Sequence, residues 1–187
     1  MRWPLPAVVA LVVGVAGCAG HDRLTTVDSR AESVGHQRLP AAATGGSGQV
    51  EAYTLKPGEG YRMPQLYAAP DPVLGERDPR RELPPTTVCL QVVVSADGAV
   101  ERSAPLSDRS ECVAGGAPEN QVLVEAAQDA VAMWRYSPAA VCHFAAGHAP
   151  VDSSDCRDAE RVEPVAVSLF YAFTFEIVHG QHTVKTR

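Results

Sequence analysis

Cysteine thiols are the side chains in this sequence that are open to the widest choice of chemistry. The chain has 187 residues and contains five cysteines, Cys18, Cys89, Cys112, Cys142 and Cys156. A thiol can be acylated, oxidised to a disulfide or used as a metal ligand, and the cellular compartment favours one of these outcomes. The N-terminal residues come first, because they indicate whether the chain is exported.

The chain opens with MRWPLPAVVALVVGVAGCAG, in which Arg2 precedes a short apolar run. The run ends in small residues directly before Cys18, a pattern that predicts a signal peptide over residues 1–17. Val15-Ala16-Gly17-Cys18 resembles the lipobox of bacterial lipoproteins. That resemblance implies cleavage before Cys18 and acylation of both its thiol and its new amino group. The alternative is an ordinary signal peptide or signal anchor with an incidental cysteine.

A lipidated Cys18 would attach the protein to a membrane, since each buried CH₂ group contributes about 0.8 kcal/mol. We therefore expect a lipid-anchored protein of the bacterial cell envelope that faces the periplasm. The residue after the cysteine is Ala19 rather than aspartate. This residue is compatible with sorting to the outer membrane.

Export leaves Cys89, Cys112, Cys142 and Cys156 in an oxidising compartment, where an even number of cysteines favours disulfides. Three pairings are possible. We favour Cys89–Cys112 and Cys142–Cys156 because each closes a short loop, a constraint worth about 3 kcal/mol. A zinc site built from Cys142, His143, His148 and Cys156 is the alternative, but its spacing matches no familiar ligand pattern.

Neither a catalytic site nor a nucleic-acid site is indicated. Ser110, Ser153 and Ser154 lack the context of a nucleophile, and no acid pair forms a recognisable signature. We expect no enzymatic activity, no cofactor and no metal. The net charge of −6 argues against a nucleic-acid partner, which usually meets a basic face.

Composition divides the mature chain into segments. Residues 18–60 are poor in large apolar side chains and are interpreted as the lipidated cysteine and a flexible tether. Residues 61–87 are rich in proline and are expected to run extended over the domain, with Arg77, Arg80 and Arg81 in a solvated loop. Residues 88–180 form the folded domain, interrupted by a polar, cysteine-bracketed insertion at 139–164.

The domain begins with an expected hairpin. VCLQVVVS alternates with Val88, Leu90, Val92 and Val94 on one face, and a second strand follows the Ala96-Asp97-Gly98 turn. A three-residue loop keeps apolar residues opposite each other, pairing Val94 with Val100, Leu90 with Ala104 and Val88 with Leu106.

A helix and a third strand follow the hairpin. Leu123, Ala127, Ala130 and Trp134 recur at helical spacing from a start near Pro118. The helix should end near Arg135 because Pro138 cannot continue it. VAVSLFYAFTFEI then alternates over 165–177. A crossover through the helix places this strand beside the first, giving an α+β fold with a three-stranded antiparallel sheet in the order 2-1-3 and the helix on one face.

Three blocks of this domain, VCLQVVVSADGAV, AAQDAVAMWRYSPA and VSLFYAFTFEI, resemble the C-terminal domain of TonB-type energy transducers. The resemblance covers about residues 88–178, roughly half of the chain. It implies that Trp134, Tyr136 and Pro138 identify the fold, with Trp134 plugging the core against the third strand. Transducers of this family couple inner-membrane machinery to outer-membrane receptors, and they bind a receptor segment by adding it to a sheet edge.

On this resemblance the third strand is an exposed edge that binds a protein or peptide partner of the envelope. A part in energy transduction or transport is a further expectation from the resemblance, although the chain has a lipobox in place of a transducer's signal anchor. The alternative is a structural lipoprotein that forms a homodimer through this edge. The expected partner-binding residues are Val165, Ala166, Val167, Ser168, Phe170, Ala172, Thr174 and Glu176.

Overall fold

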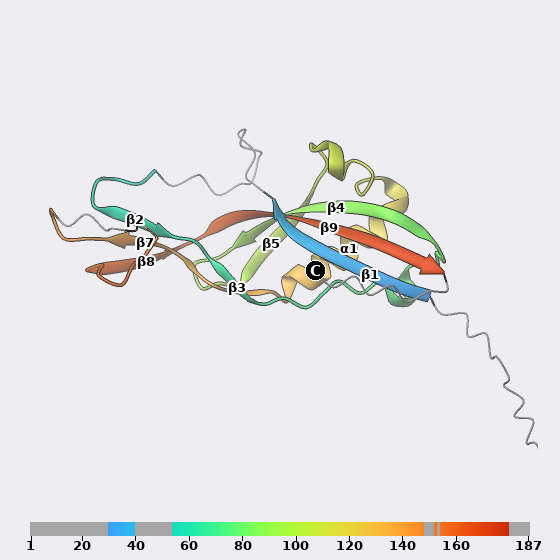
Figure 1. The fold of residues 1–187 in the computed structure, drawn as a ribbon, viewed down its shortest axis with the longest axis horizontal. Helices are drawn as coiled ribbons and strands as arrows, with labels where there is room; N and C mark the ends of the chain where they lie inside the picture. The colour runs from blue at the N-terminus through green and yellow to red at the C-terminus, as the bar shows by residue number, and fades with distance from the viewer. Residues whose placement is uncertain (1–29, 40–53, 148–151, 153, 180–187) are drawn as a thin grey trace, which may run out of the picture.

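The structure, a computed structural model, describes residues 30–39, 54–147, 152 and 154–179. Its largest part, the main sheet, is antiparallel and has the strand order β1-β9-β4-β5 (Figure 1). The helix α1 lies against one face of this sheet. These elements are β1 (Arg30–Leu39), β4 (Leu83–Val94), β5 (Val100–Leu106), α1 (Gln121–Ala132) and β9 (Val167–His179).

Five shorter strands form an arm that extends from one end of the main sheet (Figure 1). A three-stranded sheet has the order β2-β7-β8, and β3 pairs with β6. The strands are β2 (Glu59–Arg62), β3 (Gln65–Ala68), β6 (Arg135–Ser137), β7 (Ala139–His143) and β8 (Arg161–Val165). Short 3₁₀ turns are η1 (Gly75–Arg77), η2 (Ser110–Cys112) and η3 (Pro118–Asn120).

The hydrophobic core lies between α1 and the main sheet. Alternate residues of a strand share one face, so the apolar alternation in β4 and β9 creates a continuous buried surface for the helix. Burying each large apolar side chain contributes about 1.5–3 kcal/mol. The core includes Val88, Leu90, Val92 and Val94 of β4, Leu169, Tyr171, Phe173, Phe175 and Ile177 of β9, and Leu123, Ala127 and Val131 of α1.

The α+β class, the antiparallel pairing and the single helix of the domain are confirmed. The expected strand order is also present, because β5, β4 and β9 are neighbours in that sequence. The expectation of a single three-stranded sheet was wrong. A fourth strand extends the main sheet, and the arm contains a three-stranded and a two-stranded sheet.

The fourth strand, β1, corrects the interpretation of residues 18–60 as a flexible tether throughout. Residues 30–39 of that segment pair with β9, so β9 is an interior strand and not the exposed edge that we expected. Composition did not predict this strand, because β1 is held largely by backbone pairing and most of its described side chains are exposed. A strand of this kind needs few large apolar side chains.

Two expected boundaries also change. β4 starts at Leu83, so the end of the proline-rich segment at residue 87 falls inside a strand. An irregularity between Leu83 and Thr86 accommodates the two intervening prolines. The insertion at 139–164 contains β7 and β8, which pair with each other. Residues 139–142 are buried in the arm rather than in a polar excursion.

The hairpin register is partly as expected. Val94 pairs with Val100, but a bulge between Val93 and Val94 shifts the rest by one residue, so Leu90 faces Pro105 rather than Ala104. Leu106 accordingly lies opposite Cys89, and the expected pair with Val88 is absent. The shift moves Leu106 to the sheet face away from α1, where it packs against the Cys89–Cys112 disulfide.

Candidate functional site: the β9 edge and the Trp134 cluster

The outer edge of β9 carries the feature most relevant to binding. β1 pairs with it antiparallel along ten residues, from Arg30 opposite His179 to Leu39 opposite Phe170 (Figure 1). These two strands lie far apart in the sequence. The pairing of β1 with β9 is therefore similar to the pairing of a separate extended peptide with a sheet edge. Among residues 32–39, for which burial is described, Val34 and Leu39 are half-buried and the others are exposed. Backbone pairing therefore supplies much of the attachment.

A cluster of aromatic rings lies next to this edge. Trp134 is wholly buried, and its ring is 4.9 Å from Tyr171 in an edge-on arrangement and 5.7 Å from Phe173. Its indole N–H donates a hydrogen bond to the carbonyl oxygen of Pro70 over 3.0 Å. Edge-on and tilted ring pairs at such distances are favourable. Trp134 thus plugs the core against β9, as its position at the end of the helix predicted.

Tyr136 continues the cluster towards the arm. It is buried, and its hydroxyl donates a hydrogen bond to the hydroxyl of Tyr171 over 3.2 Å. Burial raises the pKa of Tyr136, and the contact with Tyr171 raises it further. The phenol is therefore neutral at physiological pH. Pro138 lies between β6 and β7, where the chain passes into the three-stranded sheet of the arm.

Most of the expected partner-binding residues do not lie on a free edge. Val165 ends β8 and Ala166 links β8 to β9. Four of the other six lie in β9 between β1 and β4, whereas Val167 and Ser168 pair with β4 beyond the span that β1 covers. Thr174 lies opposite Gly35 of β1, and its hydroxyl is 3.1 Å from the hydroxyl of Thr87. Phe170 is buried beneath the guanidinium of Arg109, 5.7 Å from the ring centroid. The remaining positions are Val167, Ser168, Ala172 and Glu176.

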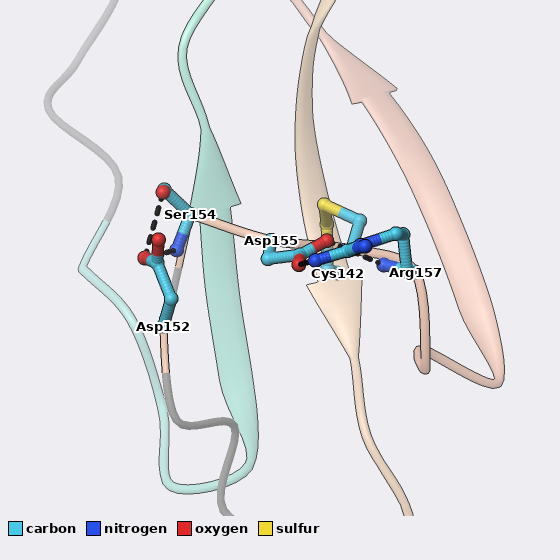
Figure 2. Close-up of a disulfide and its surroundings, with 6 residues drawn as sticks. Cys142, Asp152, Ser154, Asp155 and Arg157 are labelled. Carbon is cyan, nitrogen blue, oxygen red and sulfur yellow. Dashed lines mark hydrogen bonds and ion pairs between the residues drawn. A yellow bond between two sulfur atoms is a disulfide. The ribbon is translucent and has the colours of Figure 1, made fainter.

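Both expected disulfides are present. Cys89 and Cys112 have a Cα–Cα distance of 5.4 Å and join β4 to η2. The Cα atoms of Cys142 and Cys156 are 5.5 Å apart, and this disulfide closes the loop after β7. Figure 2 shows Arg157 alongside the Asp155 carboxylate at this second bridge, where the Nε donates over 2.7 Å. Cys142 and Cys156, the two cysteine ligands of the zinc alternative, are joined in this disulfide, and His148 lies outside the described residues.

Two basic residues of the 61–87 segment, Arg77 and Arg80, have structural partners. Arg77 donates to the Asp129 carboxylate of α1 over 2.7 Å. Arg80 forms a close pair with the buried Asp78 and also donates to Asn120 over 2.7 Å. The hydrogen bond with Asp78 raises the pKa of Arg80. These contacts attach the loop to the helix, while most of the loop stays exposed, as expected of a solvated loop.

One titratable cluster lies in the arm. His143 is 3.5 Å from a Glu59 carboxylate oxygen and 3.1 Å from one of Glu163. Arg161 donates to Glu163 over 2.8 Å. The hydrogen bond with His143 and the charge of Arg161 lower the pKa of Glu163. Within the residues that the structure describes, no group of three or more metal-ligating side chains forms a metal site.

Sequence reasoning did not identify His36 and Asp71 as residues of this region. The His36 ring is 5.0 Å from Trp134, and its Nδ1 is 3.8 Å from a carboxylate oxygen of Asp71. Both residues lie in segments that composition marks as tether or cover. The pairing of β1 with β9 brings His36 to the cluster, and the hydrogen bond from Trp134 to Pro70 brings the neighbouring Asp71.

The comparisons with known proteins find no matching family model, curated protein or solved structure. Across the described part of the chain, no helix is both long and apolar enough to span a membrane. Residues 1–17 and Cys18 lie outside the described residues, so the signal peptide and the lipidation both stay predictions.

Proposed function

We propose that the protein is a lipid-anchored binding module of the bacterial cell envelope, facing the periplasm, that binds an extended segment of another envelope protein beside β9. The observation that carries this proposal is the pairing of β1 with β9. The edge of β9 accepts a strand that lies far away in the sequence and leaves most of that strand's residues exposed. Main-chain hydrogen bonds of this kind are the usual basis of recognition by strand addition.

The partner segment takes the position that β1 occupies in the free chain. The chemistry of two other edges, β5 and β8, supports this choice. β5, the opposite edge of the main sheet, contains Pro105, and β8, an edge of the arm, contains Pro164. Proline lacks the backbone donor that a pairing strand needs, and it is common on edges that avoid association. β1 contains no proline.

Crosslinking from the sheet tests the proposal directly. A photo-reactive amino acid at Thr174, which is exposed and opposite Gly35, should trap the segment that pairs with β9 in living cells. We expect a crosslinked product with a second envelope protein, mapped by mass spectrometry to an extended segment. The matched control places the same amino acid at Ala104, which is exposed on β5 at the other edge, and should give no such product.

Two results would contradict the proposal. Crosslinks from Thr174 that reach only residues 30–39 of the same molecule would mean that β1 is a permanent strand. A product of twice the protein's mass, containing this chain alone, would favour the structural homodimer.

A part in energy transduction rests on the resemblance of the domain to TonB-type transducers. Deletion of the gene should then reduce uptake of iron chelates or vitamins through outer-membrane receptors. Unchanged uptake alongside a Thr174 crosslink to a partner would leave a binding module without a transport role.

A further inference from the structure

The side chains of β1 that face α1 meet an ordered set of groups. Alternate residues of a strand point to the same side. Glu32, Val34 and His36 therefore share the face on which Ile177, Phe175 and Phe173 of β9 form the core. Val34 packs against that core. Because these positions contact side chains and not only backbone, they can discriminate between sequences.

His36 enters a slot between rings that the core already holds in place. Its ring centroid is 5.0 Å from Trp134, 6.0 Å from Phe173 and 6.5 Å from Tyr171. The rings of Trp134 and Phe173 are fully buried, and the hydrogen bond to Pro70 fixes the Trp134 ring without involving β1. The His36 side chain is only 29% exposed, although β1 is at the edge of the sheet.

The segment between Pro70 and Gly75 forms the outer wall of the slot. Pro70 accepts the indole N–H of Trp134, and Asp71 lies 3.8 Å from Nδ1 of His36. The backbone N–H of Gly75 donates to the Glu32 carboxylate over 3.3 Å. Along β1, an acceptor, an aliphatic group and a planar ring thus follow one another at alternate positions.

We infer that the strand position beside β9 selects extended segments with the pattern acidic–x–aliphatic–x–ring, where the ring is aromatic or imidazole and lies opposite Phe173. The inference rests on the proposed function and names the chemistry of its partner. In the free protein, Glu32, Val34 and His36 are the chain's own version of this pattern. A partner segment with the same pattern fills the same contacts when it replaces β1.

Binding of synthetic peptides to the full mature chain tests this selectivity. The chain carries Val34→Pro and Gly35→Pro, because alternate residues direct their N–H groups to β9 and two consecutive prolines remove at least one donor. The probe is a fluorescently labelled peptide, RAESVGHQRL, the sequence of residues 30–39. Its affinity is compared with that of peptides carrying His36→Phe, His36→Ala and Gln37→Ala.

We expect the peptide with His36→Phe to bind within about threefold of the unchanged peptide, and the peptide with His36→Ala to bind about tenfold more weakly, because it loses the ring contacts. Gln37 is exposed and points to the other face, so its replacement should leave affinity unchanged. Equal affinity of the unchanged peptide and the peptide with His36→Ala would overturn the selectivity and leave strand addition intact. Failure of every peptide to bind would contradict strand addition, and the selectivity would fall with it.

If the variant with Val34→Pro and Gly35→Pro does not fold, hydrogen exchange in the chain without these two substitutions provides a second measurement. Exchange of the amides in 30–39 reports how often β1 opens. His36→Ala should speed this exchange about tenfold, while His36→Phe and Gln37→Ala should leave it within about twofold. Equal exchange in all three variants would overturn the inference. A dimeric mass of the unchanged chain that His36→Ala abolishes would assign the slot to a second copy's β1 instead of a separate partner.

Discussion

Trp134 connects the helix end, β9 and the segment before η1, so its side chain should be among the most important for stability. Replacing a fully buried tryptophan by alanine costs about 3–5 kcal/mol through lost burial and the cavity left behind. We expect Trp134→Ala to lower the free energy of unfolding by that amount in urea denaturation. Tyr67→Ala is the control, because Tyr67 is 70% exposed. A loss below about 1 kcal/mol for Trp134→Ala would contradict the packing described here.

Gly98 is the second residue with a sharp expectation. Its φ of 85° suits glycine, and a Cβ there would collide with the carbonyl oxygen of Tyr136. Gly147 has nearly the same φ, 84°, but no atom within 4 Å of a built Cβ. Gly147→Ala should therefore cost about 1 kcal/mol for backbone conformation alone, and Gly98→Ala at least about 2 kcal/mol more.

Thermal unfolding of the two glycine variants measures this difference. Equal effects would mean that the hairpin turn does not depend on its close approach to β6. The hydrogen bond from the Tyr136 N–H to the Gly98 carbonyl, 2.9 Å long, is the contact that requires this approach.

Single residues differed in how well the sequence identified them. Trp134 was placed correctly because the helical spacing of apolar residues ends on it, and Gly98 because an Asp-Gly pair follows an alternating strand. His36 could not be found in this way. It lies in a segment with few large apolar residues, and its slot is formed by residues that are distant in the sequence, including Trp134, Phe173 and Asp71.

At the scale of elements, the Cys89–Cys112 disulfide connects the centre of the main sheet to η2. Both sulfurs are buried on the face away from α1, together with Ala172. We expect the variant with Cys89→Ala and Cys112→Ala to lose about 3 kcal/mol of stability, since the unfolded chain gains the freedom of the opened loop. Urea denaturation measures the loss. An unchanged midpoint, in a wild-type sample shown to contain no free thiols, would argue against this contribution.

The pairing of β7 and β8 should depend on pH through Glu163. Its pKa lies below the ordinary value of 4.5 because His143 and Arg161 stabilise the carboxylate. A lowered pKa in the folded state adds stability above pH 4.5, and this stability is lost as the pH falls through the folded-state pKa. Glu163→Gln should therefore reduce stability at pH 7 and have little effect below that pKa.

Denaturation curves of the Glu163→Gln variant at several pH values check the prediction. Glu125→Gln, on the exposed face of α1, is the matched control for removing one carboxylate. A difference from wild type that stays constant from pH 7 to acid would mean that ionisation of Glu163 is not responsible.

Elements were predictable where large apolar side chains recur with a strand or helix period. β9 and the second half of β4 have the strand period, and α1 has the helical one. β1, β2 and β8 do not, because they are mostly exposed or only partly buried. Their pairing relies on backbone hydrogen bonds, which leave almost no trace in composition. β9 was therefore predicted correctly as a strand but wrongly as the edge strand of the sheet, because β1 was not predicted.

For the whole molecule, the position of β1 determines how far the domain can lie from a lipidated Cys18. A fully extended chain spans at most about 3.6 Å per residue. With β1 paired to β9, residues 19–29 connect the anchor to the sheet and span at most about 40 Å. Replacement of β1 by a partner segment would extend the connection to residue 58, with an upper limit of about 140 Å. Under the proposed function, binding and reach would thereby be coupled.

This coupling depends on the anchor, which gives the last prediction. If Cys18 is acylated, the mature chain should incorporate labelled palmitate and partition into detergent. Cys18→Ser should abolish both, because serine lacks the thiol that is acylated. Ala19→Ser leaves Cys18 and the residues before it intact and is the matched control. Globomycin, which blocks the lipoprotein signal peptidase, should leave a larger precursor in wild type. Unchanged mobility under this inhibitor would mean that an ordinary signal peptide is removed, and the anchor and its limit on reach would both be lost.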